Sequence, residues 1–590
     1  MIEVYVMKTE EQTQINIVKE TSKSGHVILK VNDYYLHSRY HPLREAQQIA
    51  DHQYKRNYLH ILFGLGSGYV AKAISQKLSE EEFLIIIEPF EQVFEESKHV
   101  VEHLERTILI REQDGQGLKE FLEPFMKRFG KKVRFICSPN YDKVSSESYQ
   151  RTLKSVKDRL YMEQVNINTI KYFSKEWQKN FTLNLFYAFD DIPFKKLTNY
   201  YTVPVVVASG GPSLTKQIPL LKKIREHIIL VSSGSTINTL LKHGIEPDYV
   251  VTIDGGIKNY EHFESLTLDH CNIIYSLSNH EGILDHLNKR GILFISKISD
   301  EIEKYTEKLL NKDVDVLTGG ASVANFALNI GYRITSGPIA LIGQDLAYTD
   351  NQTHAKYNKH YQKITEEYIK QKGLFYTEGY NGDQVLTDYP FYTMKYNFES
   401  LLKTFDDPDR IFNCTEGGIK LEGYQQISFK EFCDRYVDQK SRPRPFNLEK
   451  YPRKIIDDWR NFLVNIEKEI NVHEKVERLL QDGIILLKRN VSKQKFDRKI
   501  IKKLDRIDNQ LKEIFEDGMM SIISEPIVMD TFNNYLPGDH ETELETFQRV
   551  YARSMELYSR LQEAANDSRS YFVQLKEKIQ YKIKELENEG

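Results

Sequence analysis

Short apolar runs alternate with amphipathic stretches over the first 165 residues, which is the pattern of strands and helices in a parallel sheet. Buried strands are predicted at His60–Phe63, Phe83–Ile87 and Val133–Cys137. The first of them runs into the turn Gly64-Leu65-Gly66-Ser67-Gly68, after which a helix is expected from about Tyr69. The order of strand, glycine-rich turn and helix predicts a Rossmann-like domain over residues 1–165.

The middle of the chain repeats the α/β pattern more strongly. Residues 166–200 are aromatic and mixed in charge, and we expect them to form a helical connector. In residues 201–440, apolar runs are again separated by helical stretches, with glycines and prolines mostly at strand ends. A doubly wound α/β domain is therefore predicted there, with strands at Val203–Ala208, Ile228–Val231, Tyr249–Ile253, Asn272–Tyr275, Gly291–Ile295 and Ile339–Ile342.

The last region, 441–590, loses the strand pattern. Apolar residues recur there at spacings of 3, 4 and 3, at Leu504, Ile507, Leu511 and Ile514. A second stripe of this kind begins at Leu561, so the region is predicted to be an all-α helical bundle. Breaks between its helices are expected at Pro526 and at Pro537-Gly538. The bundle is either a packing appendage or a docking platform for a protein partner, and the pattern fits both.

Composition narrows the class of protein. The 590 residues include 81 Lys and Arg against 85 Asp and Glu, a formal net charge of −4. This balance excludes a protein that holds nucleic acid or an anionic membrane through bulk positive charge. No stretch approaches the roughly 20 apolar residues of a membrane-spanning helix. The opening residues MIEVYVMKTEEQTQ also lack the apolar core of a signal peptide, so we expect a cytoplasmic protein.

Metal and redox motifs are not evident in the sequence. The four cysteines are far apart and show no paired spacing for zinc or for a redox site. Asp-x-Asp strings occur at positions 313 and 315 and at 407 and 409, where strand or turn roles explain them equally well. We therefore predict no metal site and expect free thiols in a reducing compartment.

The N-terminal turn Gly64-x-Gly66-x-Gly68 has two features of a nucleotide-binding loop. It follows a strand and opens a helix, and Glu88 ends the next strand, about where such folds place the acceptor for a ribose hydroxyl. Backbone N–H groups in such a turn can approach an anion. The spacing is not the full dinucleotide fingerprint, so two interpretations stay open: a cofactor site, or a degenerate Rossmann-like domain kept for assembly.

A more specific pattern follows the first strand of the central region, where the chain reads Ser209-Gly210-Gly211-Pro212-Ser213. Gly210 and Gly211 allow the backbone to approach a ligand closely, and Pro212 suits the first turn of a helix. Ser213 either caps that helix or forms a hydrogen bond with a phosphate.

Further strands of this region end in similar small, polar turns. Because the carboxyl ends of parallel strands meet at one edge of a sheet, these turns together predict a ligand site at that edge. Asp254 either accepts hydrogen bonds from ribose or sugar hydroxyls or caps a helix. The Thr318 turn opens a helix whose N-terminus suits a phosphate or a carboxylate. The predicted ligand contacts in these turns are Ser233, Gly234, Asp254, Gly255, Thr318, Gly319, Gly320, Thr415 and Glu416.

Candidates for a catalytic base lie after the strand Ile339–Ile342. Asp345 and Tyr348 follow that strand directly, and His354 lies in the next loop. An imidazole beside a carboxylate suits proton transfer at neutral pH. We therefore predict His354 as the general base, oriented by Asp345, with Tyr348 lining the same site. His280, which follows another strand, is the competing candidate.

Six segments in order resemble a known family. They are SGGPSL at 209–214, the SSGS and PDYVVTIDGG segments, TGGASVANFALNIG at 318–331, IGQDLAY at 342–348 and NCTEGGIK at 413–420. Together they resemble the motility accessory factor (Maf) family of bacterial flagellin glycosyltransferases. The central region is also similar to bacterial sialyltransferases that use CMP-sialic acid, whose donor site carries a related Gly-x-Gly-Pro-Ser turn. Here Gly211 matches the glycine before Pro212, and Gly210 replaces a common Asn.

The resemblance implies a function. A nonulosonic acid, of the pseudaminic or legionaminic type, would pass from its CMP conjugate to Ser or Thr of flagellin, as flagellar assembly and motility require. The turns named above would bind the donor, the partner would be flagellin, and no cofactor beyond the CMP-activated sugar and no metal would be needed. Two alternatives remain. One is an enzyme like 6-hydroxymethylpterin diphosphokinase, which binds ATP and Mg²⁺. The other is a non-catalytic, flagellin-binding assembly factor.

Overall fold

The computed structural model describes residues 16–112, 115–297, 300–320, 322–491, 497–516, 518–538 and 541–589. The chain divides into two compact units, an N-terminal unit of residues 1–171 and a C-terminal unit of residues 172–590. The division falls inside the long helix α6, Ser146–Asp190. None of the described helices combines the length and apolar composition that crossing a lipid bilayer requires.

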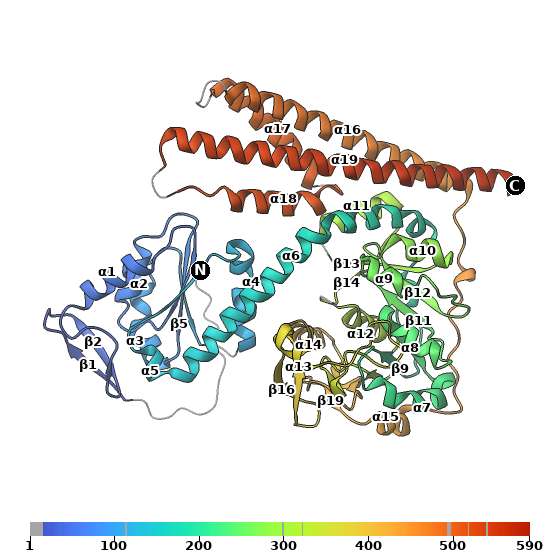
Figure 1. Cartoon of the computed structure of the whole chain (residues 1–590), viewed down its shortest axis with the longest axis horizontal. Coiled ribbons are helices and arrows are strands. Elements are labelled where there is room, and N and C mark those ends of the chain that lie inside the picture. Colours follow the sequence, from blue (N-terminus) through green and yellow to red (C-terminus); the bar gives the residue numbers. More distant parts are fainter. Residues whose placement is uncertain are drawn as a thin grey trace. The chain divides into compact units, whose positions relative to one another are not determined.

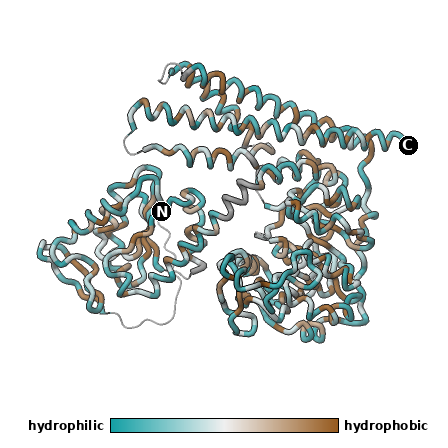
Figure 2. The backbone as a smooth tube through the Cα atoms, in the orientation of Figure 1, coloured by the Kyte–Doolittle hydropathy of each residue, from teal (hydrophilic) through white to brown (hydrophobic). Residues whose placement is uncertain are grey.

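The N-terminal unit is built on a parallel four-stranded sheet in the order β6-β5-β4-β7. The three predicted strands are confirmed as β4, β5 and β7, and β6 joins them at the edge. Figure 2 shows the hydrophobic residues of this unit gathered on these strands. The elements before α6 are β1 Ile17–Thr21, β2 Val27–Val31, β3 Tyr34–Tyr35, α1 Pro42–Gln53, β4 Leu59–Phe63, α2 Tyr69–Ser75, β5 Phe83–Glu88, α3 Glu91–Val101, β6 Thr107–Arg111, α4 Gly115–Phe129, β7 Val133–Cys137 and α5 Tyr141–Val144.

The C-terminal unit contains a parallel sheet in the order β14-β13-β12-β11-β10-β9-β15-β18-β19, with β8 (Ile192–Pro193) pairing with β13. The strand order reverses between β9 and β15, so these two neighbours flank the topological switch point where open α/β sheets bind ligands. All six strands predicted here are confirmed. The strands are β9 Val205–Ala208, β10 Ile229–Ser233, β11 Tyr249–Thr252, β12 Asn272–Ser276, β13 Ile292–Ser296, β14 Val316–Leu317, β15 Ile339–Ile342, β18 Ile411–Asn413 and β19 Gln425–Gln426.

Helices cover both faces of this sheet, which confirms the doubly wound fold (Figure 1). On β9, Val206 and Ala208 pack into one core with α7, whereas Val205 and Val207 pack into another with α12. This alternation is the two-residue period of a strand buried on both faces. The covering elements are α7 Leu214–Ile224, α8 Ile237–Lys242, α9 Ile257–Glu261, α10 Glu281–Leu287, α11 Asp300–Leu310, α12 Val323–Ile334, α13 Glu366–Lys372, the hairpin β16 Phe375–Glu378 and β17 Gln384–Thr387, α14 Tyr389–Leu402 and α15 Phe429–Tyr436.

The predicted helical region consists of α16 Ile456–Val491, α17 Arg498–Glu516, α18 Ser521–Asn534 and α19 Glu543–Glu589, drawn in orange and red in Figure 1. The break predicted at Pro537-Gly538 is confirmed between α18 and α19. The break predicted at Pro526 is wrong, because this proline lies inside α18. A proline there removes one backbone hydrogen bond, and packing of α18 along α19 outweighs that loss.

The bundle and the central sheet share one hydrophobic core. Trp459 and Phe462 of α16 and Phe572 of α19 pack in the cluster that contains strand residues of β11, β12 and β13. Phe189 of α6 stacks on Phe462, with ring centroids 4.2 Å apart. A buried polar chain reinforces this junction: Ser568 Oγ lies 2.7 Å from Gln178 Nε2 and 2.7 Å from His473 Nε2.

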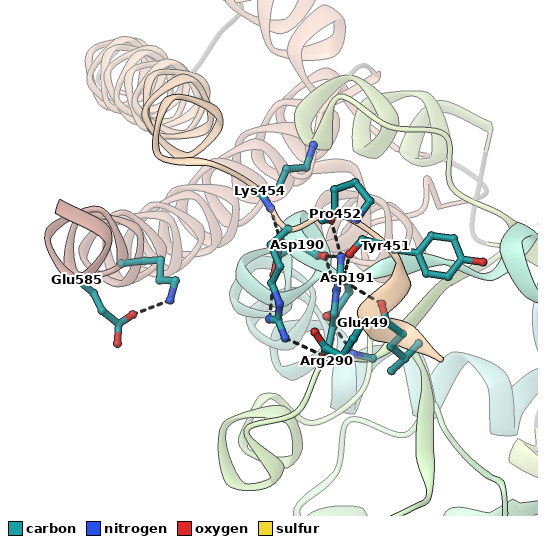
Figure 3. A network of polar contacts seen from close by, with 12 residues as sticks. Asp190, Asp191, Arg290, Glu449, Tyr451, Pro452, Lys454 and Glu585 are labelled. Carbon is teal, nitrogen blue, oxygen red and sulfur yellow. Dashed lines mark hydrogen bonds and ion pairs between the residues drawn. The ribbon is translucent and has the colours of Figure 1, made fainter. Parts of the chain in front are cut away.

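At the amino edge of the sheet, where the strands begin, Arg290 forms a cluster of hydrogen bonds that we call the arginine clamp (Figure 3). Arg290 precedes β13 and donates hydrogen bonds to the carbonyls of Asp190, Leu448, Tyr451 and Pro452, at 2.8–3.2 Å. The Asp190 carboxylate in turn accepts a hydrogen bond from the Lys454 backbone N–H at 2.7 Å. The arginine clamp thus ties the end of α6 to the segment that leads into the bundle. The loops that follow the strands lie at the other, carboxyl edge of the sheet.

Candidate functional site at the carboxyl edge of the central sheet

The loop after β9 and the loop after β15 are joined at the switch point. The backbone N–H of Gly211 donates to the carbonyl of Gly343 at 2.8 Å. Ser213 Oγ donates to Asp345 Oδ2 at 2.6 Å, and the Ser213 backbone N–H lies 3.2 Å from Oδ1 of the same carboxylate. A Cβ atom added to Gly211 would overlap the Asp345 carboxylate and would lie 2.5 Å from the Gly343 carbonyl oxygen. Only glycine fits this contact.

Asp345 is the hub of this junction. Its side chain is buried, and desolvation raises its pKa to about 6, although the hydrogen bonds from Ser213 oppose that rise. Its backbone also takes part, because its carbonyl accepts a hydrogen bond from the N–H of Ile419 in the loop after β18. Asp345, in the loop after β15, therefore links this loop to the loops after β9 and β18.

Several of the predicted donor-binding side chains use their hydroxyls to shape these loops. Ser209 Oγ donates to Gln344 Oε1 at 2.6 Å, and Ser233 Oγ lies 2.7 Å from Thr236 Oγ1. Thr415 Oγ1 accepts from the Gln344 backbone N–H at 3.2 Å. The Glu416 carboxylate accepts a hydrogen bond from the backbone N–H of Phe429 at the start of α15. Pro212 is buried, whereas Gly210 and Gly211 are half-buried and present backbone at the edge.

A segment of residues 349–362 lies against these loops. The N–H of Ala355 donates to the Gly210 carbonyl at 2.9 Å, and Asn358 Nδ2 donates to the Ser235 carbonyl at 2.8 Å. His354, next to Ala355, is half-buried, and its Nδ1 is a buried atom with no hydrogen-bond partner among the described residues. Burial lowers the pKa of His354, and the neighbouring His360 lowers it further. The ring is therefore neutral near pH 7.

His280 follows β12, the third strand from β9, and lies at the start of α10. Its Nδ1 accepts a hydrogen bond from the backbone N–H of Gly282 at 3.1 Å, and its ring stacks on Tyr260. Since a backbone N–H is always a donor, neutral His280 carries its proton on Nε2. His280 is thus placed to donate a hydrogen bond rather than to accept a proton.

Tyr348 is also engaged. Its hydroxyl donates to Asp388 Oδ2 at 2.8 Å, and Asp388 caps α14 through its other oxygen. Burial and the Asp388 carboxylate raise the pKa of Tyr348, so the phenol stays protonated. Tyr348 thus lies beside α14, and the Asp345 carboxylate bonds with Ser213, so the predicted contact between Asp345 and His354 is not found among the described residues.

The turn after β14 lies at the start of α12. Asn329 Nδ2 donates to the carbonyl of Thr318 at 2.6 Å, and Gly320 takes a positive φ of 66° against Asn397 of α14. A Cβ atom on Gly319 would overlap the ring of Phe326 at 2.5 Å. Because α12 runs back along the sheet from this edge, its N-terminus is directed at the same edge as the loops after β9 and β15.

The turn after β11 presents an exposed carboxylate, that of Asp254. The surrounding protein desolvates the Asp254 carboxyl and raises its pKa, while the backbone N–H groups of Gly256 and Gly255 hold the charged form. Asn180 of α6 donates to the Gly255 carbonyl at 3.0 Å. Two aromatic residues of α6, Phe173 and Trp177, flank this turn. Neither residue is among the candidates named from the sequence, which predicted residues 166–200 only as an aromatic helical connector.

The glycine turn of the N-terminal unit is already occupied by protein groups. The N–H of Leu65 donates to Glu88 Oε2 at 2.7 Å, that of Gly66 to the Tyr141 hydroxyl at 2.8 Å, and that of Ser67 to His37 Nε2 at 2.7 Å. Glu88 is buried, and desolvation raises its pKa to about 7. In a nucleotide site, these amides and the Glu88 carboxyl would have to be free to bind the nucleotide. Because they already bond with protein groups, the geometry favours the interpretation of this domain as a degenerate Rossmann-like domain.

Comparison with known proteins supports the fold assignment. Residues 179–351 match the family model described as 6-hydroxymethylpterin diphosphokinase MptE-like, a range that contains the loops after β9 and β11 and the beginning of the loop after β15. No curated protein sequence gave a match. Among solved structures, the chain is similar to a MAf glycosyltransferase from Magnetospirillum magneticum AMB-1, with 13% identity and a TM-score of 0.51 over 98% of this chain and 93% of that one. The chain therefore has, over nearly its whole length, the fold of a MAf glycosyltransferase, with an MptE-like region at residues 179–351.

Proposed function

We propose that this protein is a glycosyltransferase that moves a nonulosonic acid from its CMP conjugate to Ser or Thr hydroxyls of flagellin. The observation that carries the proposal is the set of loops joined through Asp345 at the β9/β15 switch point of a MAf-type fold. Glycine backbone, a directed helix N-terminus and a neutral histidine meet at this edge, which suits a phosphate-linked sugar donor.

The donor phosphate is bound by backbone at the edge in this proposal. Gly210 and Gly211 give it close approach, and the N-terminus of α12 after Thr318 supplies positive dipole. Asp345 is a positioning residue, since its carboxylate holds Ser213 rather than a ligand.

The chemical step needs a proton acceptor. The acceptor hydroxyl oxygen attacks C2 of the sugar, the bond from C2 to the phosphate oxygen breaks, and CMP leaves with the electron pair. His354 takes the hydroxyl proton, because its ring is neutral, it adjoins the glycine turn and its Nδ1 is unpartnered among the described residues. His280 is the weaker base candidate because its Nδ1 lone pair accepts from Gly282.

Intact-mass analysis of flagellin tests the proposal. Flagellin is expressed in a host that makes CMP-nonulosonic acids, together with the wild-type protein or with the His354→Ala variant. The expected result is flagellin heavier by whole sugar residues with the wild type and little or no addition with the variant. Unmodified flagellin with the wild type, in a host shown to contain the donor, would contradict the proposal. It would leave the non-catalytic, flagellin-binding interpretation.

A second candidate function is favoured by the MptE-like match. In that case the same edge would bind ATP with Mg²⁺ and transfer a diphosphate to a pterin alcohol. Titration calorimetry of the purified protein with CMP, and separately with ATP and Mg²⁺, distinguishes the two. We expect heat from CMP and none from ATP, and the reverse would favour the diphosphokinase.

A further inference from the structure

Helix α6 places a stacked aromatic pair beside the ligand edge. The rings of Phe173 and Trp177 lie 6.1 Å apart with an interplanar angle of 17°, and both side chains are half-buried. Residues four apart share one face of a helix, so the two rings form a continuous shelf on α6. Aromatic residues that keep part of their surface exposed at a binding edge are suited to stack on flat rings.

The shelf is fixed against the turn after β11. A Cβ atom on Gly255 would lie 3.1 Å from Cδ1 of Trp177, and one on Gly256 would lie 4.0 Å from Cε1 of Phe173. Asn180, one helical turn beyond Trp177, holds the Gly255 carbonyl. The shelf and the turn are therefore one rigid feature within the C-terminal unit.

Asp254 stands at the same turn with a carboxylate that faces solvent. The described residues provide no ion pair to it, and its polar neighbours are the N–H groups of Gly255 and Gly256. The Asp254 carbonyl is held by Asn259 Nδ2 at 2.7 Å and by the His280 N–H at 3.1 Å, so the turn cannot rotate freely. The result is a fixed hydrogen-bond acceptor beside an aromatic shelf.

The separation from the switch point suits a nucleotide. Strand β11 is the second neighbour of β9, which puts its end about 10 Å from the β9 loop by the usual spacing of strands. A nucleoside monophosphate whose phosphate lies at the glycine turn extends about this far to its base. An aromatic ring that stacks and a carboxylate that accepts from an exocyclic amine are the two elements by which proteins recognise cytosine.

We propose that Phe173, Trp177 and Asp254 form a base subsite that stacks the cytosine of the donor and accepts a hydrogen bond from its amine, so that the protein selects cytidine over uridine. The inference rests on the proposed function, because it assumes that the nucleotide phosphate binds at the glycine turn. Uracil carries a carbonyl oxygen where cytosine carries the amine, and that oxygen faces the Asp254 carboxylate without a proton between them. Selection therefore comes both from the bond gained with cytosine and from the repulsion with uracil.

Titration calorimetry of the full chain with CMP and with UMP tests the subsite. The wild type should bind CMP at least tenfold more tightly than UMP. Trp177→Ala and Phe173→Ala should each weaken CMP roughly 5- to 150-fold, the range found for loss of one stacking ring. Trp177→Phe should recover most of the affinity. Asp254→Asn should bring the ratio of CMP to UMP affinity close to one, because an amide can face either base.

Controls keep the test decisive. Tyr581→Ala removes an aromatic side chain that is 72% exposed on α19, and it should change neither affinity. Thermal melts identify any variant that fails to fold, and Phe173→Ala is the milder probe because its ring has the looser contact with the turn.

Three results would overturn the subsite. They are wild-type CMP affinity in folded Trp177→Ala and Phe173→Ala, an unchanged CMP preference in Asp254→Asn, and a wild type that binds UMP as well as CMP. In each of these cases CMP is still bound, so the proposed function survives. A wild type that binds ATP and ignores CMP removes the proposed function and this inference together.

Discussion

Two adjacent glycines at the switch point should respond differently to the same substitution. In Gly211→Ala the new methyl group meets the buried Asp345 carboxylate and the Gly343 carbonyl oxygen. In Gly210→Ala it meets the ends of two side chains, Asn358 Nδ2 at 3.1 Å and Thr236 Oγ1 at 3.3 Å. Neither glycine has a positive φ, so the contrast comes from space and not from backbone strain.

The magnitudes follow from what each methyl displaces. At Gly211, overpacking costs about 1–3 kcal/mol, and loosening the bonds from Ser213 to a buried carboxylate costs about 1.5–3 kcal/mol more. We therefore expect the free energy of unfolding to fall by roughly 3–6 kcal/mol in Gly211→Ala. At Gly210 the side chains can shift, so the change in stability should stay under about 1 kcal/mol. In the proposed function the donor phosphate lies at this glycine turn, so Gly210→Ala should weaken CMP binding.

Tryptophan fluorescence is a selective probe for this comparison. The chain has two tryptophans, Trp177 and Trp459, and both belong to the C-terminal unit. Urea unfolding followed by their emission therefore reports the unit that contains the switch point. Equal free energies of unfolding for the two variants would refute the reasoning, because the Asp345 carboxylate and the Gly343 carbonyl would then yield as easily as the ends of the Asn358 and Thr236 side chains.

Three further predictions address the base, the bundle junction and the N-terminal turn. His354→Ala should lower the transfer rate about 10²- to 10⁴-fold with CMP binding unchanged, and the wild-type rate should hold from pH 8 to 6.5 and fall only at lower pH, because the pKa of His354 is lowered. Ser568→Ala should cost about 1–3 kcal/mol of unfolding free energy in urea melts, by breaking the link between Gln178 and His473, while Ser570→Ala on the exposed face should cost little. Burial raises the pKa of Glu88 to about 7 in the folded unit, so the folded state favours the protonated carboxyl. This carboxyl therefore contributes most to the stability of the folded unit below pH 4.5, and its contribution falls as the pH rises to 7. The stability gap between wild type and Glu88→Gln, from circular-dichroism melts, should therefore shrink by on the order of 3 kcal/mol over that range.

The strands were predictable because a buried strand requires apolar side chains at successive positions of the sequence. The strands β7, Val133–Cys137, and β15, Ile339–Ile342, match their predictions at both ends, and the other predicted strands differ by one or two residues at an end. A strand covered on both faces is a continuous apolar run between turn residues, which few other structures produce. The edge strand β14, Val316–Leu317, is too short to leave such a run. The helix break predicted at Pro526 was wrong because the packing of α18 outweighs the one backbone hydrogen bond that the proline removes.

The position of the candidate residues at the carboxyl edge was predictable, and the contacts of their side chains were much less so. A residue that follows a parallel strand must lie at the carboxyl edge, so Ser213, Asp254 and Asp345 were found from order alone. Which atom a hydroxyl faces depends on the neighbouring strand, which is distant in sequence: Ser213 lies 132 residues from its partner Asp345. The shelf on α6 is a case of the same kind, since nothing local connects Trp177 to the turn at Gly255.

The bundle is joined to the amino edge and to the core of the central sheet, which limits how a docking role for the bundle can be tested. The amino edge is tied to the bundle by Arg290, and Trp459 of α16 lies in the same core as the strands. Removing residues 441–590 would expose that core, so loss of flagellin binding by such a truncation would not distinguish docking from unfolding. Substitutions on the exposed faces of α16 and α19 leave the core intact. A docking role for the bundle is therefore to be sought on those faces, with CMP binding at the carboxyl edge as the measure that the sheet is unharmed.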